Sequence, residues 1–176
     1  AQLLDATEKA SVKKVILISS TGVYDDAQGA VTEKDIPQPQ DNKGKQLLEV
    51  EQIFFKSPAL ETTVIRFGGL FGGSRNPVKY LAGRTGLSNG KAPVNLIHRQ
   101  DCMGIILGVI YKNAFGHIIN AVHPEHPKKA EYYIKQAKAL GLEPPQYDTE
   151  EAEETYKKVD SVTLKPVLGY TFQKSL

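Results

Sequence analysis

The side chains best suited to chemistry follow two short apolar segments of the sequence. Residues 15–18 run into "SSTGVY" (19–24), which offers three hydroxyl groups, a glycine and the phenol of Tyr24. Residues 62–67 run into "GGLFGG" (68–73), where the missing Cβ atoms let a ligand approach the backbone closely. Hydroxyl and phenol groups donate, accept and transfer protons. These two segments therefore predict a small-molecule site.

The helix predicted to begin near Gly44 offers the lysines Lys43 and Lys45, but it lacks the side chains that most often transfer protons in catalysis. Its opening stretch, "PQDNKGKQLLEVEQ" (39–52), contains no phenol, imidazole or thiol. A phenol has a pKa near 10 in water, and it transfers protons at neutral pH only when a nearby cation favours its charged form. Tyr24, on the neighbouring loop, would have to meet Lys43 or Lys45 to supply such a pair. Otherwise Tyr24 packs or forms hydrogen bonds in a structural role.

The pattern along the chain is that of an α/β fold with parallel strands. The run 15–18 lacks polar alternation, as strands covered by helices on both faces do. Residues 62–67 are rich in β-branched side chains and predict a second strand, and residues 117–122 predict a third. Helices are predicted at residues 2–10, 44–55, 101–112 and 128–142. Because ligands bind outside the carboxyl ends of the strands in such sheets, the segments after residues 18 and 67 should form one crevice.

Local patterns add four expectations. Leu3, Leu4 and Ala10 lie on one face of the first helix, which we expect to be buried. The run 68–73 is too glycine-rich to continue as a strand. Asp101 suits the N-cap of the helix at 101–112. The acidic run 148–154 is expected to be a solvated helix start.

Composition argues against several classes of protein. The 176 residues carry a net charge of +2, and basic residues alternate with acidic ones, so no nucleic-acid partner is expected. No stretch approaches the roughly 20 apolar residues of a membrane span, and no secretory signal is visible. Cys102 is the single cysteine, which favours a reducing, cytoplasmic location. No metal is expected at "HPEH" (123–126), because the prolines prevent a helix that would aim both imidazoles together.

Six blocks of the sequence, in their order, carry a resemblance to a known family. They are "VKKVILISSTGVY", "GKQLLEVEQ", "VIRFGGLFGG", "NLIHRQD", "GHIINAV" and "KKVDSVTLKPVLGYTF", the last resembling the family's final helix. Together they look like the later part of an extended short-chain dehydrogenase/reductase of the NAD-dependent epimerase/dehydratase group, most similar to its atypical YeeZ-type branch. The resemblance implies one partial domain, residues 1–176. This would be the C-terminal portion of a Rossmann-like parallel sheet with helices on both faces, plus a small substrate-side subdomain from 71–98 and 123–176.

The resemblance also implies roles for individual residues. Ser20 matches the family's catalytic serine, and Tyr24 is the second catalytic candidate. Gly69 stands where many relatives have asparagine. His98 belongs to an "H-x-x-D" feature of the substrate side, although it also suits packing and capping. The implied binding residues are Ser19, Ser20, Phe67, Gly68 and Gly69 for the cofactor, and Asn95 and His98 for the substrate.

Two departures from the family pattern bear on activity. No glycine-rich strand–turn–helix for a pyrophosphate appears, so NAD or NADP is expected to bind the full-length protein and not residues 1–176 alone. The family's catalytic Tyr and Lys, four residues apart on the active-site helix, are also missing. One alignment puts Lys43 and Leu47 at these two positions. The other keeps Lys45 as the lysine and has Asp41 in place of the tyrosine.

Three hypotheses follow. In the first, the complete protein binds NAD(P), resembles nucleotide-sugar epimerases and dehydratases, and is weakly active or inactive by the standard mechanism. In the second, it is an active epimerase, dehydratase or reductase on a nucleotide-sugar that uses displaced groups, such as Tyr24 with Lys43 or Lys45. In the third, the scaffold has only an assembly role. The helices at 2–10 and 44–55 correspond to those that relatives pair across a two-fold axis, so a homodimer is expected.

Overall fold

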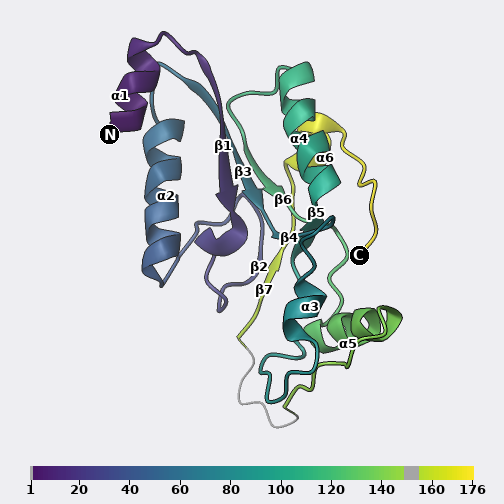
Figure 1. Cartoon of the computed structure of the whole chain (residues 1–176). Helices are drawn as coiled ribbons and strands as arrows, with labels where there is room; N and C mark the ends of the chain where they lie inside the picture. The colour runs from purple at the N-terminus through teal and green to yellow at the C-terminus, as the bar shows by residue number, and fades with distance from the viewer. Residues whose placement is uncertain (1, 149–154) are drawn as a thin grey trace.

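A three-stranded parallel sheet forms the centre of the computed structural model, which describes residues 2–148 and 155–176 (Figure 1). The strand order is β1-β3-β6, with the bounds Lys14–Ser20, Glu61–Phe67 and Ile118–Ala121. In this register Ser20 lies beside Phe67, and Phe67 lies beside Ala121. The carboxyl ends of all three strands therefore meet at one edge, and the predicted α/β fold with parallel strands is confirmed.

Helices cover both faces of this sheet. Helices α1 (Gln2–Lys9) and α2 (Asn42–Phe55) lie on one side, and α4 (Arg99–Tyr111) and α6 (Leu164–Leu168) lie on the other (Figure 1). Helix α2 begins where the proline-containing loop ends, because the Asp41 carboxylate accepts a hydrogen bond from the backbone N–H of Gly44 at 2.5 Å. This N-cap satisfies one of the unpaired donors of the first turn.

Two pairs of short parallel strands surround the carboxyl edge of the sheet. Strand β4 (Gly69–Phe71) pairs with β5 (Leu96–His98), and β2 (Gly29–Val31) pairs with β7 (Lys157–Val159). The 3-10 helix η1 (Thr21–Val23) follows β1 directly, while α3 (Pro77–Leu81) and α5 (Lys129–Ala139) lie beyond β4 and β5 (Figure 1). These pairs bring segments that are far apart in the sequence to the place where the strands of the main sheet end.

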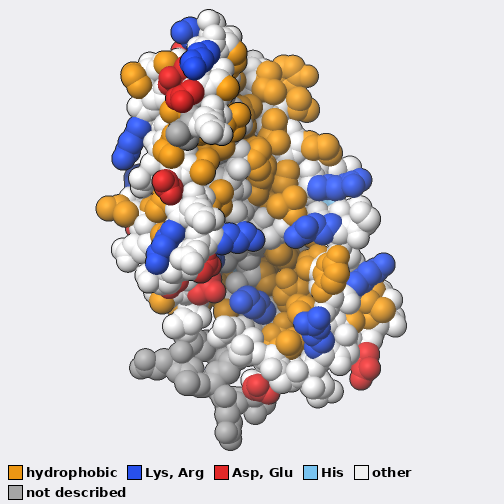
Figure 2. Space-filling view, turned by 60° about the vertical axis from the view of Figure 1, so that its left-hand side comes forward, with side chains coloured by type: hydrophobic (Ala, Val, Ile, Leu, Met, Phe, Trp, Pro, Cys, Tyr) orange, Lys and Arg blue, Asp and Glu red, His pale blue; other side chains and the backbone are white. Residues whose placement is uncertain are grey.

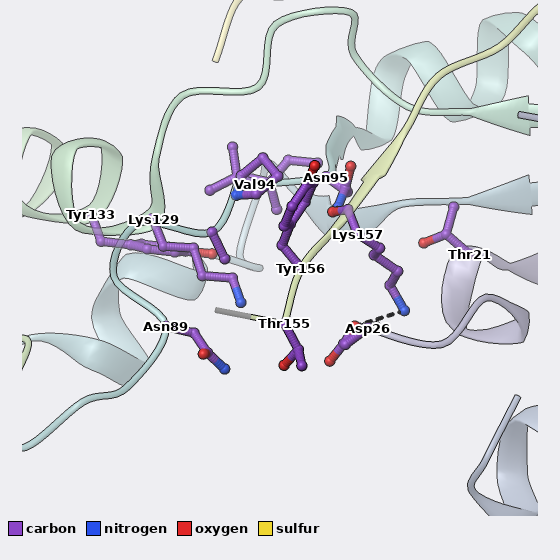
Figure 3. A pocket seen from close by; sticks show the side chains of 13 residues that line it. Thr21, Asp26, Asn89, Val94, Asn95, Lys129, Tyr133, Thr155, Tyr156 and Lys157 are labelled. Carbon is purple, nitrogen blue, oxygen red and sulfur yellow. Dashed lines mark hydrogen bonds and ion pairs between the residues drawn. The ribbon is translucent and has the colours of Figure 1, made fainter. Parts of the chain in front are cut away.

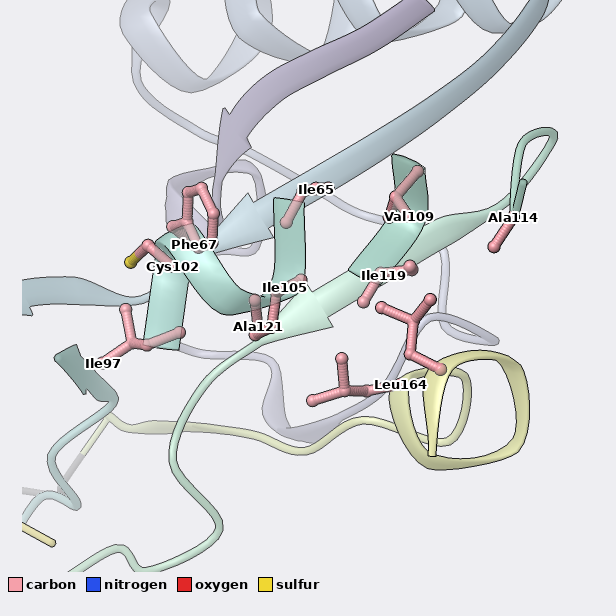
Figure 4. Packing of buried hydrophobic residues seen from close by; sticks show 11 residues of the cluster. Ile65, Phe67, Ile97, Cys102, Ile105, Val109, Ala114, Ile119, Ala121 and Leu164 are labelled. Atoms are coloured by element: carbon pink, nitrogen blue, oxygen red, sulfur yellow. The ribbon is translucent and has the colours of Figure 1, made fainter. Parts of the chain in front are cut away.

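The main hydrophobic core lies between the sheet and α4 (Figure 4). Ile65 and Phe67 of β3 and Ile119 of β6 pack with Ile105 and Val109 of α4, and all five side chains are buried. Side chains on a strand alternate between the two faces, so the residue between Ile65 and Phe67 faces α2. That residue is an arginine, and its partner on α2 is described below.

Two expectations for particular segments have different outcomes. Leu3 is 70% exposed and no residue of α1 is buried, so the expected buried face of this helix is wrong. Hydrophobic spacing identifies one side of a helix, but it does not decide whether another element covers that side. Of the acidic run 148–154, residues 149–154 lie outside the described residues.

Strand β3 ends at Phe67, as expected for the glycine-rich run that follows, but a separate short strand begins two residues later. Residues Gly69–Phe71 form strand β4, although glycine disfavours strands. The backbone N–H of Gly69 donates to the carbonyl of Asn95 at 2.7 Å, just before β5 begins. Pairing with β5 therefore overrides the local preference of these glycines.

The expected N-cap of α4 is wrong by three residues. His98 caps the helix, because its Nδ1 accepts a hydrogen bond from the backbone N–H of Gln100 at 3.2 Å. Asp101 is fully buried in the first turn instead. Its Oδ1 accepts hydrogen bonds from the Tyr170 hydroxyl (2.9 Å) and the backbone N–H of Gln173 (2.7 Å). The carboxylate thus holds the last residues of the chain, and the stretch resembling the family's final helix is helical only over Leu164–Leu168.

Candidate active site

The two serines at the end of β1 have different partners. Ser20 is half-buried, and its Oγ accepts a hydrogen bond from the backbone N–H of Gly22 at 3.1 Å, where η1 begins. Ser19 is buried, and its hydroxyl donates to a carboxylate oxygen of Glu51 on α2. Because the Ser20 hydroxyl acts as an acceptor here, it keeps its own proton for a hydrogen bond to a ligand. The hydroxyl proton of Ser19 is already used within the protein.

The hydroxyl of Tyr24 lies inside the protein, with the residue 1% exposed. It donates to the carbonyl of Thr32 (2.9 Å), lies 3.2 Å from the amide oxygen of Asn120, and accepts a hydrogen bond from Arg66 Nη1 (2.7 Å). Burial raises the pKa of this hydroxyl above its usual value, and the guanidinium of Arg66 offsets only part of that rise. These contacts favour the structural role of Tyr24 over the alternative role in proton transfer.

The start of α2 reaches the loop after β1 through glycine backbone. A Cβ atom on Gly44 would lie 2.8 Å from the carbonyl oxygen of Gly22, so only glycine permits this close approach. Lys43 and Lys45, on either side of Gly44, are exposed, and the hydrogen bonds of the Tyr24 hydroxyl described above involve neither of them. The structure therefore gives no support to the proposed pairing of Tyr24 with a lysine of α2.

Gly68 and Gly69 face another part of the protein. A Cβ atom on Gly68 would lie 2.8 Å from the carbonyl oxygen of Asn95 and 3.2 Å from a methyl group of Val122. A Cβ atom on Gly69 would lie 2.9 Å from a methyl group of Leu96. The missing side chains thus allow close packing of the segment at the start of β5. The glycines are explained by this packing and not by the approach of a ligand. The cofactor roles of Gly68, Gly69 and the buried Phe67 stay predictions.

The two residues expected to bind substrate, Asn95 and His98, both have structural partners. The Asn95 amide donates to the carbonyl of Lys157 and accepts from the N–H of Val159, each at 2.8 Å, so it fixes β7 against the loop before β5. His98 caps α4 and packs edge-on against Phe71, with ring centroids 5.1 Å apart. Asn95 also lines the pocket described next, and His98 lines a separate pocket together with Phe71.

The pocket that Asn95 lines has a volume of about 230 Å³ and adjoins the end of β1 (Figure 3). Thr21 and Asp26 line it from the loop after β1, and Asn95 contributes from the loop before β5. Lys129 of α5 and Lys157 of β7 supply two ammonium groups. Tyr133 and Tyr156 provide aromatic rings, and Asn89 and Thr155 provide further polar groups. The pocket therefore combines cationic, polar and aromatic groups, as sites for small polar ligands do.

Several of these lining residues were missed at the level of sequence. Lys129, Lys157 and Asp26 lie on three segments that nothing in the sequence pattern links. Lys157 reaches the pocket because β7 pairs with β2, and its Nζ contacts Asp26 Oδ1 at 3.0 Å and the carbonyl oxygen of Tyr24 at 2.6 Å. The lysines in the run "KKVD" (157–160) gave a weak signal, since they stand in one of the blocks that resemble the family.

This chain resembles known proteins both in sequence and in fold. No family model matches the chain. Protein YeeZ of Escherichia coli strain K12 is 34% identical to it over 172 residues, which are 98% of this chain and 62% of YeeZ. The sequence of this chain is thus similar to that of YeeZ along almost its whole length. It spans less than two thirds of the length of that relative.

Solved structures share the fold of this chain. A functionally unknown conserved protein from Silicibacter pomeroyi DSS superposes with a TM-score of 0.84 at 22% identity, covering 98% of this chain and 67% of that one. MoeE5 in complex with UDP-glucuronic acid and NAD gives 0.82 at 21% identity, covering 99% and 64%. The UDP-glucuronic acid 4-epimerase from Bacillus cereus gives 0.80 at 21% identity, covering 99% and 61%. The predicted Rossmann-like architecture is therefore confirmed.

Neither a metal cluster nor a membrane-spanning helix is found in the part of this chain that the structure describes. Within residues 2–148 and 155–176, no three His, Cys, Asp or Glu side chains come together as metal ligands. His123 Nδ1 accepts from the N–H of Glu125 at 3.2 Å, and His126 contacts the carbonyl of Val94 and the carboxylate of Asp160 at 2.9 and 3.2 Å. In the same residues, no helix is both long and apolar enough to span a bilayer.

Proposed function

We propose that this chain is a portion of an NAD(P)-binding protein, similar to nucleotide-sugar epimerases and dehydratases, that has little or no activity by the family's standard mechanism. Within it, residues 71–98 and 123–176 form the substrate side. The bound complexes of MoeE5 with UDP-glucuronic acid or UDP-glucose and NAD support a small-molecule substrate of this chemical class.

The arrangement at the carboxyl edge of the sheet carries this proposal. Ser20 and Phe67 lie side by side at the ends of β1 and β3, and the pocket begins at Thr21, the next residue along the chain. In one alignment, the helix that faces this edge, α2, has Lys43 and Leu47 where the resemblance places the catalytic pair. In the other it has Lys45 as the lysine, with Asp41 before the helix in place of the tyrosine. A site that keeps its serine and its pocket but lacks the Tyr/Lys pair fits binding better than turnover.

The nicotinamide cofactor, when bound, supplies hydride transfer in this family. We expect Ser20 to face it, because the hydroxyl of Ser20 keeps a proton to donate to a polar group. The side chain of Ser19 is committed to Glu51, so any contact of Ser19 would be made through its backbone. The residues present therefore fit the part of the cofactor nearest to the substrate.

The surface beside β1 supports a larger sheet in the complete protein. Figure 2 shows hydrophobic side chains gathered along the middle of the face turned toward the viewer. Exposed apolar side chains of β1 and α4 include Ile18, Met103, Leu107 and Ile110. Contiguous exposed apolar surface of this kind marks an interface. We expect the rest of the dinucleotide-binding sheet to cover it.

The experiment is a titration of the full-length protein with NAD, NADH, NADP and NADPH by calorimetry, followed by hydride-exchange assays with nucleotide-sugars. Binding of a dinucleotide without turnover is the expected result. Turnover that exceeds that of a Ser20→Ala variant would favour instead the second hypothesis, an active epimerase, dehydratase or reductase. Failure to bind any dinucleotide would remove both hypotheses and leave the assembly role.

A further inference from the structure

Two ammonium groups from distant parts of the sequence enter the pocket beside Ser20. Lys129 stands at the start of α5 and Lys157 on β7, and Figure 3 shows both side chains turned toward the space bounded by Asn89, Thr155 and Asp26. Lysine binds phosphate as a compact point charge, and amide and hydroxyl groups can complete the hydrogen bonds of its oxygens. The lining of the pocket is therefore suited to an anionic group.

One carboxylate already stands among the described residues that line the pocket. Asp26 Oδ1 lies 3.0 Å from Nζ of Lys157, which also donates to the backbone carbonyl of Tyr24 at 2.6 Å. The Asp26 side chain is 71% exposed, whereas that of Lys157 is 18% exposed. Tyr24 is fixed by its buried hydroxyl, so its carbonyl holds Lys157 in place. Of the two groups that contact Lys157 Nζ, the Asp26 carboxylate is therefore the one that water or a ligand can replace.

The ion pair between Asp26 and Lys157 is weak enough to be exchanged. Pairs with one exposed partner contribute little to stability, because water screens the attraction and ordering the side chains costs entropy. A diphosphate group carries at least two negative charges against the single charge of a carboxylate, so it competes well for the same ammonium group. If the ion pair broke, the Asp26 carboxylate would be fully hydrated at little cost, because its side chain is already 71% exposed.

We infer that Lys129 and Lys157 hold a phosphate group of the ligand and that Asp26 is an internal competitor for Lys157, which the ligand must displace. This inference rests on the proposed function, since it concerns the same pocket and a phosphate-bearing ligand. It adds a role for Asp26: the carboxylate lowers the affinity for anions and so favours ligands with more than one phosphate.

The test is calorimetric titration of the full-length protein with UDP and with inorganic pyrophosphate, and with uridine as the uncharged comparison. Asp26→Asn should bind both anions about 2- to 5-fold more tightly, given the usual strength of such pairs. Lys129→Met and Lys157→Met should each weaken binding of the anions about 10-fold or more, and uridine should respond to none of these changes. Lys157→Arg, which keeps the charge, should retain most of the affinity.

Glu131→Gln is the matched control, because it removes one negative charge from an exposed side chain of α5 that lies outside this pocket. An Asp26→Asn protein that binds UDP no more tightly than the Glu131→Gln protein would overturn the inference, and so would unchanged affinity in both lysine variants. A protein that binds NAD(P) but neither UDP nor pyrophosphate would also overturn it and leave the proposed cofactor binding intact. A protein that binds none of them would overturn both.

Discussion

Arg66 and Glu51 form a buried ion pair that joins β3 to α2. Arg66 Nε lies 3.1 Å from both carboxylate oxygens of Glu51, Nη2 lies 2.6 Å from one of them, and both side chains are 3% exposed. The pair continues to the loop after β1, because Glu51 accepts from Ser19 and Arg66 donates to Tyr24. The segment that carries Ser20 is thus fixed to α2 and β3 by one connected network of polar side chains.

Replacing Glu51 by alanine should lower the free energy of unfolding by about 3–5 kcal/mol, because it leaves the charge of Arg66 buried without its partner. The measurement is urea denaturation followed by circular dichroism. Glu49→Ala, at an exposed position of the same helix, is the control and should change stability by less than about 0.5 kcal/mol. Equal stabilities of the two variants would contradict the role given to the pair.

Removing the hydroxyl of Tyr24 should affect stability and leave catalysis unchanged. Tyr24→Phe deprives the Thr32 carbonyl and Arg66 of a buried hydrogen-bond partner, which costs about 1–3 kcal/mol. Denaturation curves measure the loss, and any hydride exchange by the full-length protein should keep its rate. A large fall in that rate with little loss of stability would instead identify Tyr24 as the displaced proton donor of the alternative hypothesis.

Stability should fall in alkaline solution because several tyrosines are buried. Burial raises the pKa of Tyr24 and Tyr132, and it raises the pKa of Tyr133 to about 12. A group with a pKa higher in the folded than in the unfolded protein, near 10, stabilises the fold below pH 10 and loses this contribution as pH rises toward the folded pKa. Unfolding free energies between pH 8 and pH 11.5 should therefore decrease, and Tyr133→Phe should decrease less steeply. Parallel pH profiles for the two proteins would contradict this account.

Substituting Gly68 after β3 should destabilise the protein, because a side chain there would clash with neighbouring backbone. Gly68→Ala places a Cβ atom 2.8 Å from the backbone oxygen of Asn95 and should cost about 1–3 kcal/mol through overpacking. Gly22→Ala is the comparison, because its Cβ atom would lie 3.4 Å from the nearest atom, Ser20 Oγ. Thermal denaturation of both variants without any ligand is the measurement. A neutral Gly68→Ala would mean that the segment before β5 adjusts easily.

The homodimer predicted from the resemblance can be tested at α1 and α2. Leu3 on α1 and Phe55 on α2 are exposed apolar side chains, 70% and 38% respectively. A charge buried in such an interface is unpaired, so Leu3→Glu or Phe55→Glu should shift the full-length protein from dimer to monomer in analytical ultracentrifugation. Ile36→Glu, at an exposed site of the loop before α2, is the matched control. A monomeric wild-type protein would remove the prediction.

The strands and the long helices could be predicted because their signals are local. The run 15–18 is apolar without interruption and residues 62–67 are rich in β-branched side chains, and β1 and β3 contain these segments. Strands β2 and β7 could not be found this way, because each has only three residues. In β7 two of the three are lysines, Lys157 and Lys158, which do not suggest a strand packed inside a protein. Their pairing depends on a contact between parts of the chain that lie more than a hundred residues apart.

The candidate site was also predictable only where local sequence decides the outcome. The place of Ser20 follows from the rule that ligands bind at the carboxyl ends of parallel strands, and it does not depend on contacts with distant parts of the chain. The choice between Asp101 and His98 as a cap depended on what else Asp101 could reach, and the hydroxyl of Tyr170 lies 69 residues away in the sequence. The cationic lining of the pocket could not be predicted for the same reason, since Lys129 and Lys157 line one pocket only after α5 and β7 have packed in the folded protein.

Strand β1 has a consequence for handling the protein. Among the described strands it pairs with β3 alone, so one row of its backbone N–H and C=O groups points away from the sheet. Such a row is a template for any extended segment, and residues 15–18 contain neither a charge nor a proline to discourage it. Molecules of residues 1–176 alone should therefore stack strand upon strand into aggregates. A further strand paired with β1 would occupy this row of groups and prevent such stacking.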